Sequence, residues 1–252
     1  MFRVGGSCLF FTHIFDTKSI QALVFFAKAD ILKTLLVIFL SMKLFCTSAW
    51  LSNTLLKDVF YNICDTKPKN ILYIITAAKS VWGKSWVIQN LNDFSEFWEI
   101  DIIDLAGLEA DIFQAKIDWA DILVFWGWEA SYLMKKIYEK WYEHIIQNAV
   151  KSGKIYVWLS AGSIAACQSL WTASECIFDL SPWEAPKGLW LTDISFRPHL
   201  NAEKFPKIRE ENMSSIFEKY KTPFYALDDD SALLIEKSEI TVISQWKWKY
   251  YQ

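Results

Sequence analysis

The sequence predicts an α/β protein in which helices cover both faces of a mainly parallel sheet, a three-layer sandwich. Two observations carry this prediction. Short apolar runs typical of buried strands recur at residues 43–49, 70–78, 99–107, 120–127 and 154–162. The segments between them are longer and helix-like. Because strands that alternate with amphipathic helices form right-handed βαβ crossovers, their sheet is parallel, and function gathers at the carboxyl ends of its strands.

The individual elements follow in chain order. Helix-like segments are expected at residues 53–64, 131–137 and 142–150, between the apolar runs. After Leu200 comes a charged helical stretch. Strand-like runs at 224–230, 232–236 and 240–244 are then expected to finish the sheet. No internal repeat, low-complexity tract or linker interrupts residues 42–252.

The composition limits the classes of protein to which the chain could belong. The chain has 252 residues, 53% of them hydrophobic, which suffices for one large domain with a substantial core. Its net charge of -3 gives no electrostatic argument for nucleic acid. The five cysteines are odd in number and form no CxxC pair, so we expect free thiols in a reducing, cytoplasmic compartment; they are Cys8, Cys46, Cys64, Cys167 and Cys176. The three histidines are scattered, and we expect neither a metal nor a cofactor.

Residues 1–41 differ from the rest of the chain. Their apolar clusters are broken by charged residues, and the longest apolar run falls short of the ~20 residues that a membrane span needs. No convincing small-residue cleavage site follows the apolar run at 31–40. We therefore interpret residues 1–41 as a spurious or poorly ordered extension and residues 42–252 as the functional domain, starting at Met42. A genuine targeting segment remains the alternative.

The stretch VWLSAGSIAA at residues 157–166 is a buried strand that runs into a serine and then a helix. A nucleophilic serine is presented on such a strained turn, where the residues two before and two after it must be small. Gly162 meets this condition after Ser160, whereas Trp158 violates it before Ser160. From the residues alone, a serine at a helix N-terminus is more often a cap than a catalyst.

Six stretches together resemble the peptidase family typified by dipeptidase E, which includes the cyanophycinases. They are MKLFCTSAW, YIITAA, VFWGWEASYL, VWLSAGSIAACQS, GLWLTDISFRPHLN and YALDDDSALL, and they extend over nearly all of residues 42–252. The resemblance implies a class I glutamine amidotransferase-like, flavodoxin-like fold. It also implies a serine peptidase that hydrolyses short peptides with an N-terminal aspartate through an acyl-enzyme. The alternatives are a cyanophycinase-like hydrolase and a catalytically inactive, amidotransferase-like binding protein.

The resemblance also implies the catalytic roles. Ser160 would be the nucleophile, and His199 would be the general base. Asp229 would orient the histidine, although Asp228 and Asp230 flank it and remain open. The oxyanion hole would use the backbone N–H of Ala161 and that of the loop at Gly127 or Trp128. A true glutamine amidotransferase would instead have a cysteine nucleophile and a glutamate two residues after its histidine, where this chain has Asn201.

For the substrate, the resemblance implies recognition of an acidic group. Glu129 and Arg209 are the expected substrate-binding residues, and Arg197 is a second candidate cation because it lies nearer His199. We expect a small peptide as the partner, with no nucleic acid and no membrane. A homodimer is left open.

Tryptophan stands where this family has glycine. The chain contains 14 Trp and 8 Gly, whereas glycine ordinarily makes up about 7% of residues. We interpret the tryptophans as glycines encoded by UGA and read with the wrong translation table; the alternative is a tryptophan-rich, degenerate homologue. The clearest positions are Trp50, Trp126, Trp128, Trp158 and Trp190. We extend the hypothesis to Trp82, Trp98, Trp119, Trp141 and Trp246, and leave Trp86, Trp171, Trp183 and Trp248 undecided.

Overall fold

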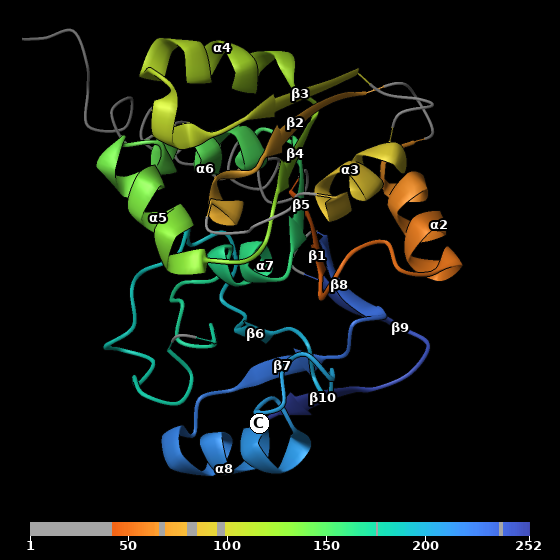
Figure 1. Cartoon of the computed structure of the whole chain (residues 1–252), viewed down its shortest axis with the longest axis vertical. Coiled ribbons are helices and arrows are strands. Elements are labelled where there is room, and N and C mark those ends of the chain that lie inside the picture. The colour runs from red at the N-terminus through yellow and green to blue at the C-terminus, as the bar shows by residue number, and fades with distance from the viewer. Residues whose placement is uncertain (1–41, 66–68, 80–84, 95–98, 175, 237–238) are drawn as a thin grey trace, which may run out of the picture.

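The computed structural model describes residues 42–252 except 66–68, 80–84, 95–98, 175 and 237–238 (Figure 1). The segment 1–41 lies outside the described residues, so its interpretation stays a prediction. The same holds for Trp82 and Trp98. In the described part of the chain, no helix has the length and apolar character that crossing a membrane requires.

A seven-stranded sheet forms the centre, in the order β3-β2-β4-β5-β1-β8-β9. Its first five strands along the chain pair in parallel, while β8 and β9 complete one edge in antiparallel pairing. The bounds are β1 (Lys43–Thr47), β2 (Asn70–Ile74), β3 (Glu99–Ile103), β4 (Ile122–Phe125), β5 (Ile155–Leu159), β8 (Ser231–Glu236) and β9 (Glu239–Ser244). The predicted α/β fold with a mainly parallel sheet is confirmed.

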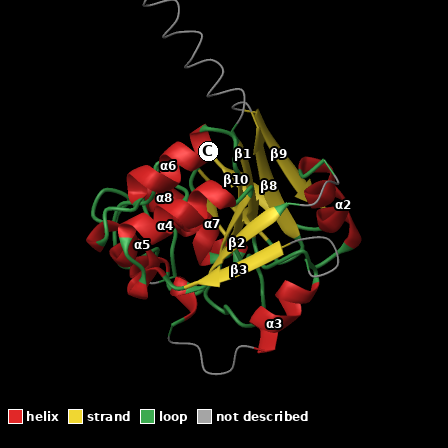
Figure 2. Cartoon of the chain, turned by 90° about the horizontal axis from the view of Figure 1, so that it is seen from above, coloured by secondary structure: helices red, strands yellow, loops and turns green. Residues whose placement is uncertain are grey.

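Helices cover both faces of this sheet (Figures 1 and 2). One face carries α2 (Thr54–Ile63) and α3 (Ser85–Asn92), and the other carries α4 (Ala110–Trp119), α5 (Ala130–Glu139), α6 (Glu143–Lys151) and the short α7 (Ala161–Ala165). The alternation of strand residues explains the two layers. On β4, Leu123 and Phe125 pack with the α4–α7 side, whereas Ile122 and Val124 pack with the α2–α3 side.

Two of the expected strands end earlier than the apolar pattern suggests. The runs at 70–78 and 99–107 each end in a single turn of 3-10 helix, η1 (Thr76–Ala78) and η2 (Leu105–Gly107). Thr76 joins these two turns, because its hydroxyl accepts the backbone N–H of Leu105 at 2.8 Å. Both turns lie at the carboxyl ends of their strands, where the chain leaves the sheet.

A second, three-stranded sheet has the order β10-β7-β6 and packs beside α8 (Glu210–Tyr220) (Figure 1). Its strands are β6 (Phe196–Arg197), β7 (Phe224–Leu227) and β10 (Trp248–Tyr251). The expectation that residues 224–230 finish the central sheet is therefore wrong. β7 pairs instead with β10, where Tyr225 and Tyr250 stack with ring centroids 4.4 Å apart.

Candidate active site

Ser160 lies on a strained turn at the carboxyl end of β5. Its φ of 50° and ψ of -113° place it outside the ordinary regions, directly before α7. Its backbone N–H donates to the carbonyl of Thr47 on the neighbouring strand β1 at 3.1 Å. The side chain makes no capping hydrogen bond to α7. Because strain of this kind costs about 1–3 kcal/mol and persists mainly at functional sites, the turn has the character of a nucleophile elbow.

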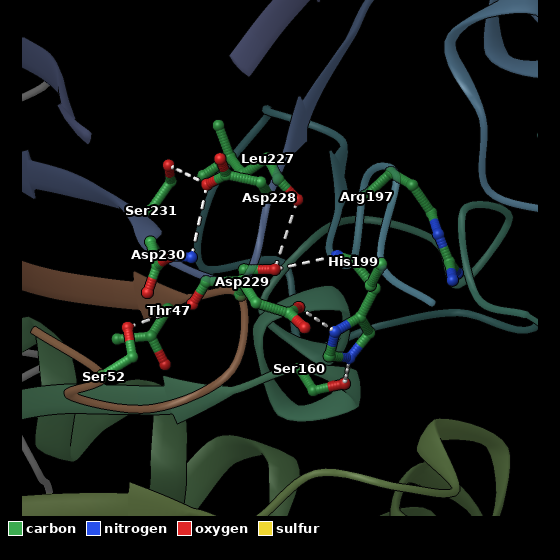
Figure 3. A network of polar contacts seen from close by, with 12 residues as sticks. Thr47, Ser52, Ser160, Arg197, His199, Leu227, Asp228, Asp229, Asp230 and Ser231 are labelled. Carbon is green, nitrogen blue, oxygen red and sulfur yellow. Dashed lines mark hydrogen bonds and ion pairs between the residues drawn. The ribbon is translucent and has the colours of Figure 1, made fainter. Parts of the chain in front are cut away.

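His199 follows β6 and faces the serine. Its Nε2 lies 2.6 Å from the Ser160 Oγ, in hydrogen-bonding contact (Figure 3). The histidine backbone is held in the left-handed region, with a φ of 67°. Ser48 supports this conformation, since its Oγ accepts the His199 N–H at 2.8 Å and donates to the Leu227 carbonyl at 3.2 Å. Ser48 thus joins the end of β1 to the ends of β6 and β7.

Asp229 is the acid that reaches the imidazole. Its Oδ1 lies 2.5 Å from the His199 Nδ1 (Figure 3). The contact follows from topology: β6 and β7 pair in parallel, with Arg197 opposite Ala226, so the residues after both strands emerge side by side. The neighbouring aspartate Asp228 instead closes a turn.

The carboxylate of Asp228 is used in that turn. It accepts the Ser231 hydroxyl at 2.5 Å and the backbone N–H groups of Asp230 and Lys247 at 3.3 Å and 2.8 Å. Asp230 contributes its carbonyl, which accepts the Asn53 side-chain amide at 3.1 Å. The three adjacent aspartates, of which the resemblance favoured Asp229, therefore make three different sets of contacts.

The surroundings of His199 favour the neutral imidazole. Burial lowers the pKa of His199 below its ordinary value, and the nearby positive charges of Arg197 and Lys204 act in the same direction. The hydrogen bond to Asp229 and its negative charge raise this pKa and partly oppose the burial. Phe205 stacks on the imidazole, with ring centroids 4.2 Å apart and planes 13° from parallel. A neutral, oriented imidazole can accept a proton from Ser160.

The expected oxyanion loop lies directly against the elbow. A Cβ on Gly127 would lie 2.6 Å from the Leu159 carbonyl oxygen, 2.9 Å from the Ser160 Cβ and 3.3 Å from the Ala161 nitrogen. Only glycine fits such an approach. The backbone of Gly127 and that of Ala161 are thus brought together beside the serine, where two N–H donors would serve a developing oxyanion.

The tryptophans of this region are in unfavourable settings. Trp128 has a φ of 114°, which is an outlier for a bulky residue. Trp158 is fully buried and stacks on Phe125 at 4.5 Å, and its indole Nε1 has no hydrogen-bond partner among the described residues. Its Cε3 lies only 2.9 Å from where a Cβ on Gly162 would lie. Gly162 therefore lies in close contact with Trp158, on the opposite side of Ser160 in the sequence.

A cavity of about 1010 Å³ opens over the serine and holds most of the expected site. Its walls include Ser160, His199 and Asp229, the expected oxyanion residues Gly127, Trp128 and Ala161, and Glu129 at the start of α5. Arg197 also lines the cavity. Arg209 is not among its lining residues; its guanidinium donates to the Ala202 carbonyl at 2.9 Å at the start of α8. Within the described ranges, no group of three or more His, Cys, Asp or Glu could hold a metal ion.

Sequence reasoning missed two residues that hold the triad, Ser48 and Phe205. Ser48 is fully buried, yet a serine after a strand gives no signal by itself. Phe205 lies in a polar loop six residues after His199, where an aromatic residue is unusual enough to have been noticed. Arg197, which the sequence analysis did name, is the last residue of β6 and lies two positions before His199.

Comparison with known proteins agrees with this geometry. The family model described as peptidase family S51 matches residues 45–243. One similar structure, assigned as peptidase E from Listeria monocytogenes EGD-e, has 19% identity and a TM-score of 0.68, covering 81% of this chain and 99% of that one. A peptidase from an acI-B1 Actinobacterium has 17% identity and a TM-score of 0.56, covering 84% and 95%. These structures show a shared fold. No curated protein matches the chain.

Proposed function

The chain belongs to peptidase family S51, and we propose that it is a serine-type peptidase that hydrolyses short peptides with an N-terminal aspartate. The observation that carries the proposal is the unbroken line of hydrogen bonds from Ser160 through His199 to Asp229. Membership of the family makes the chain a peptidase; the serine mechanism and the aspartyl substrate are the parts that we propose.

In the proposed reaction, the His199 Nε2 removes the proton of the Ser160 hydroxyl, and the Oγ attacks the scissile carbonyl carbon. The carbonyl oxygen becomes negative and is stabilised by the N–H groups of Ala161 and of the loop at Gly127 or Trp128. When the intermediate collapses, the C–N bond breaks and His199 gives its proton to the leaving amine. An ester between the Ser160 Oγ and the aspartyl carbonyl remains.

Water then completes the cycle. His199 takes a proton from the water, which attacks the ester carbonyl, and Ser160 regains its proton as the aspartate leaves. Throughout, Asp229 holds the Nδ1 proton in place and stabilises the imidazolium that forms transiently. Because the Asp229 side chain is 47% exposed, solvent screens part of this charge, so its main task is to fix the tautomer and orientation of the ring.

The described cysteines do not compete with Ser160 for the role of nucleophile. Cys46, Cys64, Cys167 and Cys176 are buried free thiols. Burial raises the pKa of Cys64 and of Cys167 to about 12, which keeps both protonated near neutral pH. Free thiols also accord with the cytoplasmic location that we propose.

The test is hydrolysis of aspartyl dipeptides by the purified chain, followed by release of the free amine. Ser160→Ala should lower kcat by on the order of 10⁴-fold or more while circular dichroism is unchanged, because the triad loses its nucleophile. Ser215→Ala is the control, since that hydroxyl is exposed and donates to the Glu211 carbonyl on α8. Activity that survives Ser160→Ala, or an unsubstituted chain without peptidase activity, would overturn the proposal.

A further inference from the structure

We infer that Lys204 binds the carboxylate of the leaving residue, so that the site favours dipeptides with a free C-terminus. The inference rests on the proposed function and deepens it, because it assigns recognition of the second residue of the substrate to one side chain. The sequence expectation placed substrate binding on Glu129 and Arg209 and did not name Lys204.

The leaving residue must lie on the His199 side of the cavity. In the proposed reaction the imidazole gives its proton to the leaving amine, so that amine must come within hydrogen-bonding reach of the His199 Nε2. This nitrogen lies 2.6 Å from the Ser160 Oγ (Figure 3). In a dipeptide, only the Cα atom separates the leaving amine from the C-terminal carboxylate. The carboxylate is therefore held close to the imidazole as well.

The loop at residues 200–209 forms this side of the cavity. Phe205 stacks on the imidazole with ring centroids 4.2 Å apart, and it lines the cavity together with Lys204. The backbone of the loop is fixed, because the Phe205 N–H donates to the Ala202 carbonyl at 3.1 Å and the Ile208 N–H donates to the Phe205 carbonyl at 2.9 Å. Lys204 thus extends from an ordered backbone next to the proposed general base.

The ammonium of Lys204 can reach a ligand at the mouth of this cavity. The residue is exposed, and among the residues that the structure describes it has no ion-pair partner. Burial is the main cause that lowers the pKa of His199, and the positive charge of Lys204 adds to it, so the ammonium lies near the imidazole. A lysine has a flexible four-carbon stem, which lets its charge follow a carboxylate.

The other cations near the site are less suited to this role. Arg209 is not part of the cavity lining, and neither is Lys207, whose ammonium lies over an aromatic ring 5.6 Å away. Arg197 does line the cavity, but its guanidinium donates at 2.7 Å and 2.9 Å to two oxygens of the segment 172–174. Lys204 is the lining cation that stands beside Phe205, on the side where the leaving residue must lie.

The experiment compares aspartyl-leucine with aspartyl-leucine amide, which have nearly the same shape and differ in the charge of the C-terminus. The ratio of their kcat/KM values is independent of the fraction of folded enzyme, so a poorly folding variant still gives an answer. Lys204→Met should reduce the preference for the free acid by about 3- to 10-fold, the strength of a partly exposed ion pair. Lys204→Arg should keep most of the preference. Lys207→Met removes an exposed lysine of the same loop and is the matched control, which should leave the ratio unchanged.

The salt dependence distinguishes an ionic contact from a structural role. Raising the salt concentration from about 0.05 M to about 0.5 M should reduce the preference of the unsubstituted chain, because salt screens exposed charges. The ratio of Lys204→Met should not respond to salt. A residue that only shapes the loop would change both substrates alike and would give no such difference.

A binding measurement separates this inference from the proposed reaction. With Ser160→Ala as the background, the dipeptide should bind more tightly than its amide by calorimetry, and adding Lys204→Met should remove most of that difference. If neither compound is hydrolysed by the unsubstituted chain but the difference in binding depends on Lys204, the reaction is wrong and the subsite stands. If Lys204→Met lowers both substrates equally, or if the ratio changes in Arg209→Met instead, the inference is overturned.

Discussion

The hydroxyl of Ser48 accepts the backbone N–H of His199 at 2.8 Å, across 151 positions of the chain. This bond holds the proposed general base by its backbone, in a left-handed conformation that histidine seldom adopts. The position of the imidazole is thus determined from β1 of the central sheet as well as from β6.

Replacing Ser48 with alanine should therefore impair catalysis without touching a reacting atom. We expect kcat to fall by about 10- to 100-fold with KM little changed, because small displacements of a catalytic group are costly. The unpaired buried groups should lower the free energy of unfolding by about 1–3 kcal/mol. Ser214→Ala, which removes a hydroxyl bonded to the Glu210 carbonyl on α8, is the control. A kcat at the unsubstituted level would show that β6 alone positions the histidine.

The three neighbouring aspartates should respond differently to substitution by asparagine. Asp229→Asn should lower kcat by on the order of 10³- to 10⁴-fold, because an amide favours the wrong imidazole tautomer. Asp228→Asn should lower the melting temperature and leave kcat largely intact, since that carboxylate closes the turn to Ser231 and Lys247. Asp230→Asn should change neither. Steady-state kinetics and thermal melts of the three variants check these assignments, and a catalytic loss confined to Asp228→Asn would reverse them.

The acid limb of the pH profile should lie below the ordinary pKa of histidine, about 6.5. Burial lowers the pKa of His199, so the active, neutral form persists to lower pH. Phe205→Ala should admit water to the ring, raise this pKa and move the limb of kcat/KM to higher pH. Phe217→Ala, whose ring lies 6.4 Å from Tyr251, is the control. An unchanged limb in Phe205→Ala would mean that this stacking does not exclude water.

The same pKa shift should affect stability. The folded state binds the His199 proton less readily than the unfolded state does, so this group makes the protein less stable as pH falls below about 6.5. Urea unfolding of the unsubstituted chain and of His199→Gln between pH 5 and 7.5, chosen to span about that pKa, measures the contribution. The substituted protein should show the weaker pH dependence.

Two glycines offer a matched test of the oxyanion loop. Gly127→Ala should lower both stability and kcat, because its Cβ would meet the Leu159 carbonyl at 2.6 Å and push the loop away from Ser160. Gly107→Ala should be nearly silent, as no atom lies within 4 Å of its added Cβ. Equal activity of both variants would show that the loop takes no part in stabilising the oxyanion.

At three tryptophans, the backbone geometry supports the hypothesis that the residue is a glycine encoded by UGA. Trp128, Trp141 and Trp190 have φ values of 114°, 60° and 55°. Trp141 follows the C-cap of α5, and the Tyr142 N–H donates back to the Ile137 carbonyl at 2.9 Å. That is the helix-ending motif in which glycine is preferred.

We expect TGA codons at these positions and at Trp50, Trp126 and Trp158, with glycine found by mass spectrometry of the native protein. Trp171 should be TGG, because its indole is buried, donates to the Ser195 hydroxyl at 2.9 Å and meets Phe224 edge-on. Trp50 is the most stringent test of the hypothesis. Its indole Nε1 contacts Asp93 at 2.5 Å, and a glycine could not make this contact. TGG codons throughout would end the hypothesis.

The sequence was sufficient for the parallel strands of the central sheet and for the serine that follows one of them, because both are local patterns. Buried strands read as apolar runs, and Ser160 closes one of them. The sequence was insufficient to predict which strand pairs with β7. Its partner β10 is a short aromatic segment with no strand-like alternation of apolar and polar residues. The family resemblance favoured Asp229, but the residues alone could not choose among three adjacent aspartates, since the choice depends on which carboxylate the turn to Lys247 already uses. Contacts between distant segments, such as Ser48 with His199, leave no trace in local patterns.

The division of the triad between two sheets has a consequence for biosynthesis. Ser160 follows β5 of the large sheet, whereas His199 and Asp229 follow β6 and β7 of the small one. During translation the ribosome delivers Ser160 well before His199 and Asp229, and it delivers β10, which pairs with β7, later still. In the proposed mechanism, a growing polypeptide that has completed only its first five strands has Ser160 without its base. Peptide hydrolysis by that mechanism begins only when the last part of the chain docks.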